Sequence, residues 1–228
     1  LDLCRRDFTV NAMAYSEKKG IIDLFGGESD LENGIIRCVG SPDERFNEDG
    51  LRILRALRFA SVLDFELDAD CADSVRRLRG LLGKISRERI YTETTKLLLG
   101  KGARRILSTF PEVISFIFPA LTEEMICRAA ALVERCPRDA EMRYAVLLSE
   151  LDAKEEERMI SSMKPSRAEK NAVLRYSEYE NYRNYLDCEY EVRRLISETD
   201  DGFVLSLTDM QLSRGVITDE EYAAVREM

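Results

Sequence analysis

The chain has 228 residues, of which 45% are hydrophobic and 34% charged, and its formal net charge is -9. This composition is typical of a globular protein with one or two domains that bury real cores. The sequence has no apolar run long enough to cross a membrane and no secretory signal pattern, so we expect no membrane partner. It also has no histidine, which excludes Ser-His and Cys-His nucleophile pairs and histidine-based metal hydrolases.

The six cysteines are scattered along the chain without C-x-x-C spacing, at positions 4, 38, 71, 127, 136 and 188. Because no histidine could complete a site with them, zinc is disfavoured. We therefore expect reduced thiols and a cytoplasmic protein.

The N-terminal part of the chain predicts a small α+β segment. Asp7 or Thr9 is expected to cap a helix that opens the chain. Residues 20–25 predict a short strand, residues 26–27 (Gly-Gly) a hairpin turn, and residues 35–39 a second strand. Two strands are too few for an independent sheet, so we expect them at the edge of a larger sheet whose other strands lie upstream.

From residue 42 onward the pattern is helical, so the predicted fold class is mainly α. The first helix is expected over residues 46–63. Further helices are expected over residues 70–82, from Ser86, over 122–135, 138–151 and 153–163, and after capping signals at Ser166, Thr208 and Thr218. Residues 176–191 are rich in tyrosine, which could stack on bases. Their acidic neighbours favour helix packing instead.

The charged flank of the first predicted helix carries the main functional signal. Asp49, Arg52, Arg55 and Arg58 fall at steps of three, so on a helix turning about 100° per residue they share one half of the cylinder. Leucine, isoleucine and alanine occupy the other half, and Phe59 is the one apolar residue expected among the arginines. The simplest interpretation is a solvated face with an Asp–Arg pair at i, i+3, which is worth about 0.2–0.5 kcal/mol.

A second interpretation follows from hydrogen-bond types. A carboxylate only accepts hydrogen bonds and a guanidinium only donates them. Adenine and cytosine each present an exocyclic amine beside an unprotonated ring nitrogen, which would match Asp49 beside Arg52. Uracil and guanine would be mismatched, and such a bidentate contact discriminates by about 1–3 kcal/mol. Arg55 and Arg58 could meet phosphates, so the helix predicts a nucleoside triphosphate site.

The charge is unevenly distributed along the chain. Residues 1–110 hold 19 basic and 18 acidic side chains, and the remainder holds 15 and 25. Residues 76–105 carry ten basic residues against two acidic ones, which could meet a polyanion. Within this narrow strip the candidate RNA contacts are Arg76, Arg77, Arg79, Arg87, Arg89 and Lys96.

Four stretches together resemble the ordered motifs of one family. They are RRDFTVNAMAY at residues 5–15, DLFGG at 23–27 with IRCVG at 36–40, EDGLRILR at 48–55, and SRERI at 86–90 followed by Glu93. The family is that of the class II tRNA nucleotidyltransferases, which comprises the CCA-adding enzymes and bacterial poly(A) polymerases. The resemblance is strong over residues 1–100 and diffuse beyond them.

This resemblance implies a chain divided into head, neck, body and tail. The corresponding segments would be residues 1–41 for the end of a nucleotidyltransferase head, 42–110 for the neck, 111–199 for the helical body and 200–228 for the start of the tail. The implied activity is transfer of C or A nucleotides from CTP or ATP to the 3′ end of tRNA. The implied partners are tRNA or another RNA 3′ end, ATP and CTP.

The resemblance also assigns roles to individual side chains. Arg6 would touch the triphosphate and Asp7 would lie beside the sugar. Asp49 and Arg52 would act as an amino-acid template for the incoming base, in agreement with the hydrogen-bond argument. Arg55 and Arg58 would support that template or the phosphates.

The chain departs from the family pattern in its metal site. Family members hold two Mg²⁺ ions with an Asp-x-Asp on a head strand upstream of the RRDFT motif. We therefore expect the catalytic carboxylates upstream of Leu1, no catalytic or metal-binding residue in this chain, and no activity from these 228 residues alone. The only Asp-x-Asp here, residues 68–70, is expected to cap a helix. Gly50 replaces the usual proline of the family, which should loosen the start of the template helix.

Several alternatives stay open at the level of sequence. The enzyme could add C and A, A alone or C alone, since members with each specificity share these motifs. A relative that binds RNA or a nucleotide without chemistry is a second class of function. A helical scaffold is a third, but it leaves Arg6, Asp49 and Arg52 without a role. The sequence does not specify an oligomeric state.

Overall fold

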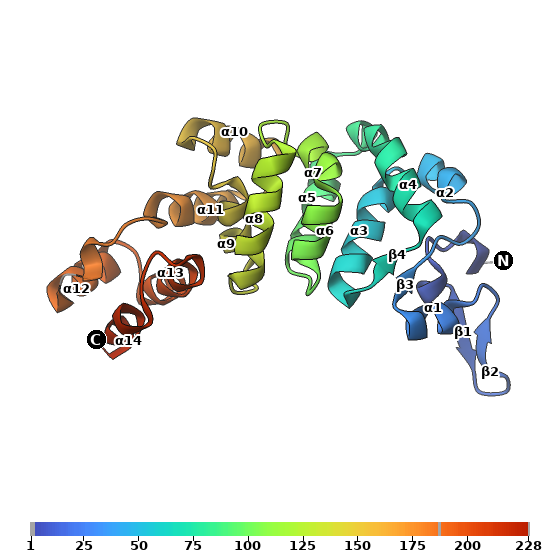
Figure 1. Cartoon of the computed structure of the whole chain (residues 1–228), viewed down its shortest axis with the longest axis horizontal. Coiled ribbons are helices and arrows are strands. Elements are labelled where there is room, and N and C mark those ends of the chain that lie inside the picture. Colours follow the sequence, from blue (N-terminus) through green and yellow to red (C-terminus); the bar gives the residue numbers. More distant parts are fainter. Residues whose placement is uncertain (1–2, 187, 228) are drawn as a thin grey trace. The chain divides into compact units, whose positions relative to one another are not determined.

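The computed structural model describes residues 3–186 and 188–227 (Figure 1). Within these ranges it contains fourteen α-helices and four short strands, which confirms the mainly α fold with a small α+β segment at the N-terminus. The chain forms two compact units, Leu1–Cys127 and Arg128–Met228. The finer division into head, neck, body and tail stays a prediction. None of the described helices has the length and apolar character needed to span a bilayer.

The strands of the first unit form two separate two-stranded sheets. Strand β1 (Met13–Ser16) pairs antiparallel with β2 (Gly20–Asp23), and β3 (Ile35–Ile36) pairs parallel with β4 (Glu66–Leu67). The two strands predicted from the sequence therefore do not share a sheet among the described residues. The second is also shorter than predicted, because beyond Ile36 the backbone turns to the N-terminal segment.

The N-terminal segment is not the predicted helix. Thr9–Asn11 forms a single 3₁₀ turn that leads directly into β1. The two expected capping side chains are used elsewhere, since Thr9 Oγ1 donates to Asp30 Oδ2 at 2.7 Å and Asp7 pairs with Arg55. The side chains of Asp7 and Thr9 are therefore bonded to residues of other segments and do not cap a helix.

The glycine pair at residues 26–27 is likewise not a hairpin turn. Gly26, at φ +77°, precedes helix α1 (Gly27–Asn33), whose first residue is Gly27. A Cβ added at Gly27 would lie 2.3 Å from the carbonyl oxygen of Thr9. The pair therefore lets α1 approach the backbone of the N-terminal segment closely.

The helix predicted over residues 46–63 is in fact two helices. Helix α2 (Pro42–Glu48) ends before Asp49, which is extended at φ -147°, and α3 (Leu51–Leu63) begins after Gly50. The break is stabilised locally, because Asp49 Oδ1 accepts the backbone N–H of Leu51 at 3.0 Å. The predicted apolar face is confirmed, because Leu51, Ile53, Leu54, Leu57 and Ala60 are all buried; Ala56, which was not assigned to this face, is buried as well.

The remaining helices of the first unit surround α3, which packs against α5 and α6. They are α4 (Ala69–Leu78), α5 (Arg87–Leu98), α6 (Ala103–Thr109) and α7 (Pro111–Ile117). The start of α5 after Ser86 is as predicted. The helix predicted over residues 70–82 ends earlier, at Leu78, and continues as a 3₁₀ segment over Arg79–Lys84. Asp68 precedes α4 as its N-cap residue, but its carboxylate bonds Arg37 instead of the helix backbone.

The second unit is entirely helical over its described residues. Helix α8 crosses the division between the units, and the helices in chain order are α8 (Glu123–Arg135), α9 (Ala140–Leu148), α10 (Ala153–Ser162), α11 (Arg167–Tyr179), α12 (Glu189–Glu198), α13 (Asp201–Arg214) and α14 (Asp219–Glu227). The capping box of Ser166 is confirmed, and Thr218 and Glu221 bond each other's backbone N–H groups before α14. The start predicted at Thr208 is wrong, because this residue lies inside α13 and its hydroxyl donates to the Val204 carbonyl.

The tyrosine-rich stretch contributes mainly to packing. Tyr185 is fully buried and its hydroxyl donates to Gln211, and Tyr176 is 8% exposed and packs against Phe203. Tyr190, in contrast to these two residues, is 69% exposed. Helix packing is thus the role of Tyr176 and Tyr185, as the acidic context favoured.

Gly50 gives a direct test of the break between α2 and α3. A Cβ at this position would lie 2.9 Å from Leu81 Cβ and 3.1 Å from the Leu81 carbonyl oxygen. Gly50→Ala should therefore lower the free energy of unfolding by about 1–3 kcal/mol, as overpacking does. Gly80→Ala is the matched control, because a Cβ there meets nothing within 4 Å and should change stability by no more than about 1 kcal/mol. Urea unfolding of both variants measures the difference, and equal stabilities would show that Gly50 is not needed for packing.

Candidate nucleotide-binding site

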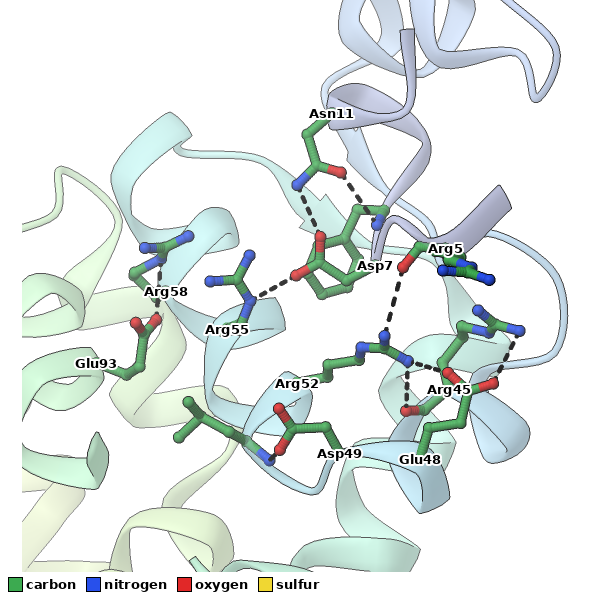
Figure 2. A network of polar contacts seen from close by, with 12 residues as sticks. Arg5, Asp7, Asn11, Arg45, Glu48, Asp49, Arg52, Arg55, Arg58 and Glu93 are labelled. Atoms are coloured by element: carbon green, nitrogen blue, oxygen red, sulfur yellow. Dashed lines mark hydrogen bonds and ion pairs between the residues drawn. The ribbon is translucent and has the colours of Figure 1, made fainter. Parts of the chain in front are cut away.

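The N-terminal segment and α3 meet through an ion pair whose carboxylate is buried. Arg55 Nε lies 2.5 Å from Asp7 Oδ2, as Figure 2 shows. The other carboxylate oxygen of Asp7 accepts the side-chain amide of Asn11 at 2.8 Å. Asn11 in turn accepts the backbone N–H of Phe8 at 3.3 Å. This arrangement brings together two predicted site residues that are 48 positions apart in the sequence.

Asp7 is only 6% exposed, yet its carboxylate is held in the charged form. Burial by itself raises the pKa of a carboxyl group, because it disfavours the charge. Here the hydrogen bonds from Arg55 and Asn11 outweigh burial and hold the pKa of Asp7 below its ordinary value. Asp7 is therefore an anion that fixes Arg55 in place.

A second buried carboxylate holds Arg58 one turn further along α3. Arg58 Nε lies 3.2 Å from Glu93 Oε2 of α5, and both side chains are mostly buried. The Arg58 guanidinium also stacks on Phe59 at 4.0 Å from the ring centroid. Phe59 packs edge-on against Phe8, at 5.5 Å between ring centroids. The apolar residue expected among the arginines thus serves as their packing surface.

Arg52 points toward α2 and the N-terminal segment (Figure 2). Its Nη1 donates to Glu48 Oε2 at 2.5 Å and to the Arg45 carbonyl oxygen at 3.0 Å. Its Nη2 donates to the carbonyl oxygen of Arg5 at 3.4 Å. Arg52 therefore lies next to the segment that carries Arg6 and Asp7, and 18% of its side chain is exposed.

Asp49 keeps an accessible carboxylate at the start of α3. Its Oδ1 accepts the Leu51 N–H, its Oδ2 accepts Arg89 Nη2 at 3.0 Å, and 35% of the side chain is exposed. The Asp49–Arg52 ion pair of the simplest interpretation does not form, since Arg52 pairs with Glu48 and Asp49 with Arg89. Both members of the proposed template are thus held by other partners, and neither is fully buried.

The remaining predicted site residues are more dispersed. Arg6 is exposed beside Asp7. Four of the six basic candidates for RNA binding pair with carboxylates, namely Arg76 with Glu112, Arg77 with Asp43, Arg89 with Asp49 and Lys96 with Glu93. Two donate to backbone carbonyls, namely Arg79 to Arg76 and Arg87 to Ile117. Their role in RNA binding stays a prediction. The acidic partners Asp43, Asp49 and Glu112 lie outside residues 76–105, whereas Glu93 lies within this stretch.

The carboxylates of this site do not fit a divalent metal ion. Asp7, Asp49, Glu48 and Glu93 each form an ion pair with an arginine. Over the described ranges, no group of three or more Cys, Asp or Glu residues is placed to hold a metal. We therefore assign these four carboxylates to the positioning of arginines.

Sequence reasoning missed four residues that position the site. Asn11, Arg45, Glu48 and Glu93 received no role, although three of them lie within or beside the motifs that carried the family resemblance. The role of Glu48 could have been found from its spacing, because it lies four residues before Arg52 and side chains at i and i+4 are neighbours on a helix. Glu93 gave no such signal, because its partner Arg58 lies 35 positions earlier on another helix.

Comparison with known families finds matches to two domains of one family. Residues 1–37 match the model of the poly(A) polymerase head domain, and residues 64–125 match that of the probable RNA- and SrmB-binding site of polymerase A. A CCA-adding enzyme from Streptococcus gordonii is 37% identical over 226 residues, which cover 96% of this chain and 55% of the relative. One from Ligilactobacillus salivarius is 45% identical over 133 residues, covering 58% of this chain and 33% of the relative.

Solved structures show the same fold. A Bacillus stearothermophilus CCA-adding enzyme in complex with CTP superposes with a TM-score of 0.83 at 29% identity, over 99% of this chain and 58% of that one. A tRNA nucleotidyltransferase with a primer tRNA and an incoming ATP analogue gives 0.71 at 25% identity, over 99% and 70%. These matches support the assignment of the chain to the family of class II CCA-adding enzymes and poly(A) polymerases. It spans only about a third to a half of the length of the curated relatives named above.

The lowered pKa of Asp7 predicts how stability depends on pH. A carboxyl group whose pKa is lower in the folded state stabilises the fold above its unfolded pKa of about 3.9, and this contribution is lost as the pH falls through the folded value. Asp7→Asn should therefore cost about 1–3 kcal/mol of unfolding free energy at pH 7, because Arg55 loses its charged partner. The difference from the wild-type chain should shrink as the pH is lowered through the range below about 4.

Urea unfolding at a series of pH values measures this difference. Asp73→Asn is the control, since this carboxylate on α4 is 79% exposed and should change stability by no more than about 0.5 kcal/mol. A cost of Asp7→Asn that stays constant down to the acid limit would contradict the assigned ionisation.

Proposed function

We propose that the intact protein is a nucleotidyltransferase that adds C and A nucleotides from CTP and ATP to the 3′ end of tRNA. The single observation that carries this proposal is the placement of Asp49 and Arg52. One offers a partly exposed acceptor and the other a partly exposed donor, next to the N-terminal segment with Arg6 and Asp7. The family, and relatives described as CCA-adding enzymes, support the same activity.

Base selection would use hydrogen-bonding capacity that the internal contacts leave over. A carboxylate offers about four lone-pair positions, and Leu51 and Arg89 use two of those on Asp49. An exocyclic amine of adenine or cytosine can therefore be accepted without breaking either contact. Arg52 carries five N–H donors, of which those on its two terminal nitrogens already meet three acceptors. A small rotation of this side chain would direct a donor toward the unprotonated ring nitrogen.

Phosphate binding would fall mainly to the arginines that the buried carboxylates hold. Asp7 fixes Arg55 and Glu93 fixes Arg58 through one edge of each guanidinium. The remaining N–H groups are thereby pre-oriented, so little side-chain entropy is lost when a phosphate binds. Arg6, exposed beside Asp7, would complete this set of cations.

The proposed reaction needs metal ions, which we do not assign to carboxylates of these 228 residues. Two Mg²⁺ ions would be held by carboxylates of a head segment that the present sequence does not include, because the carboxylates described above are committed to arginines. We infer accordingly that these 228 residues alone bind nucleotide without transferring it.

RNA contacts and location complete the proposal. The tRNA end would meet the strip of Arg76, Arg77, Arg79, Arg87, Arg89 and Lys96, where phosphates would replace carboxylates as partners of the exposed cations. Replacement of this kind makes affinity strongly dependent on salt.

The cysteines at positions 4, 38, 71, 127, 136 and 188 are all free thiols, which supports a cytoplasmic location.

Two alternatives differ from this proposal in the product that they make. A poly(A) polymerase of the same family would extend any RNA 3′ end with A, and a non-catalytic relative would bind RNA or nucleotide without extension. The test uses the intact protein with transcripts of tRNA that end before C, after C and after CC. We expect each transcript to be completed to CCA and extension to stop there. Runs of A would assign the polymerase, and absence of any extension would overturn the proposed transfer.

The template assignment predicts a change in base choice. Asp49→Ala and Arg52→Ala should each reduce discrimination against UTP and GTP by at least about tenfold in kcat/KM, since a bidentate contact carries about 1–3 kcal/mol. Asp73→Ala removes an exposed carboxylate of the same unit and should leave the ratio unchanged. Competition between labelled CTP and UTP measures the ratio. Full rejection of UTP and GTP by both template variants would show that other groups read the base.

We expect Arg89 to affect base choice by orienting the Asp49 carboxylate, in addition to any contact that it makes with RNA. Its Nη2 is one of the two donors that orient the Asp49 carboxylate, so Arg89→Ala should lower discrimination against UTP and GTP about three- to tenfold. Lys84→Ala is the charge-matched control, because Lys84 is an exposed cation of the same basic stretch. It should leave base choice unchanged. A purely electrostatic role of Arg89 would weaken RNA binding in salt titrations while the ratio of nucleotides stays as in the wild type.

A further inference from the structure

Two cysteines from distant parts of the sequence touch each other inside the first unit. The sulfur atoms of Cys38 and Cys71 are 3.8 Å apart, and the two side chains are 3% and 0% exposed. Cys38 follows β3, and Cys71 lies in the first turn of α4. The proposed function uses neither thiol. Two thiols in contact can form a covalent bond.

The pair is asymmetric in its access to solvent. Cys38 lies on the wall of a surface cavity of about 240 Å³ that Arg37, Asp68 and Asp70 also line. A small neutral molecule that enters this cavity would therefore lie next to Cys38. Cys71 lies behind it, and the hydrogen bond with Cys38, together with burial, raises the pKa of the Cys71 thiol.

We propose that Cys38 and Cys71 form a disulfide-forming site that responds to a small hydroperoxide. The Cys38 sulfur attacks one peroxide oxygen, the O–O bond breaks, and the other oxygen leaves with the thiol proton as water or an alcohol. Cys38 is then a sulfenic acid, Cys38–S–OH. The Cys71 sulfur attacks the Cys38 sulfur, the S–O bond breaks, and hydroxide leaves with the Cys71 proton as water. Two thiols are oxidised by two electrons, and the peroxide is reduced.

The cross-link would enclose the part of the chain that reads the nucleotide. Residues 38–71 contain α2, the break at Asp49 and all of α3, so the loop carries every template and phosphate-binding candidate except Arg6 and Asp7. The backbone of Cys38 also forms a bridge with Phe8, directly after Asp7. Closing the sulfur–sulfur distance from 3.8 Å to the bond length of about 2.05 Å would draw this segment toward α4. Oxidation would therefore act on the segment that fixes Arg55.

The test is peroxide treatment of the folded chain, with Cys4, Cys127 and Cys188 replaced by serine because these three are exposed. We expect a mass loss of about 2 Da, one peptide pair that joins Cys38 to Cys71, and full reversal by a dithiol reductant. The melting temperature of the oxidised chain should rise by roughly 5 °C or more, since the bond closes a loop with 33 positions between its ends.

Two single variants make the outcome decisive. With Cys71→Ser, the sulfenic acid of Cys38 has no partner and should be trapped by dimedone. With Cys38→Ser, no cross-link should form and Cys71 should resist the same treatment. The site is overturned if the folded chain with both thiols gives no joined peptide, or if Cys71 is oxidised as fast in the Cys38→Ser variant. This test measures bond formation directly, so it does not depend on nucleotide transfer.

Discussion

The ion pair between the buried Asp7 carboxylate and the half-buried Arg55 is the interaction on which the site depends. It joins the N-terminal segment to α3, alongside the contact of Phe8 with Phe59 and the hydrogen bond from Arg52 to the Arg5 carbonyl. Because Asp7 is almost fully buried and charged, its partner cannot move away without a large electrostatic cost. The position of Arg6, next to Asp7 in sequence, and that of Arg52, bonded to the Arg5 carbonyl, follow from this one contact.

A second constraint is the break between α2 and α3. A continuous helix would place Asp49 on the same rigid rod as Arg52, with the two side chains one turn apart. The extended backbone at Asp49 instead turns its carboxylate back over the start of α3, where it accepts the Leu51 N–H and meets Arg89 of α5. The carboxylate is thereby fixed by groups from two helices. Gly50 permits this geometry, because the chain packs against Leu81 where a side chain would collide.

Charge compensation is a property of the whole first unit. The arginines of α3, α4 and α5 pair with carboxylates that lie elsewhere in the sequence, including Asp7, Asp43, Glu93 and Glu112. The local excess of positive charge in residues 76–105 is therefore partly neutralised, at Arg76, Arg77, Arg89 and Lys96. On such a surface, a polyanion would bind by exchange of partners at these side chains.

The sequence by itself determined the family, the mainly α fold, the amphipathic face of α3 and the identity of the Asp49 and Arg52 template candidates. These features rest on local periodicity, on capping signals such as that of Ser166, and on motifs whose residues are close in sequence. Tertiary structure decided the rest. Thr9 and Asp7 did not cap a helix, and residues 26–27 began α1 instead of a hairpin, because their partners Asp30, Arg55 and the Thr9 carbonyl belong to other segments. Likewise Glu93 and Arg89 became part of the site only through the packing of α5 against α3, since the pairing of charges across helices depends on distances that no local pattern encodes.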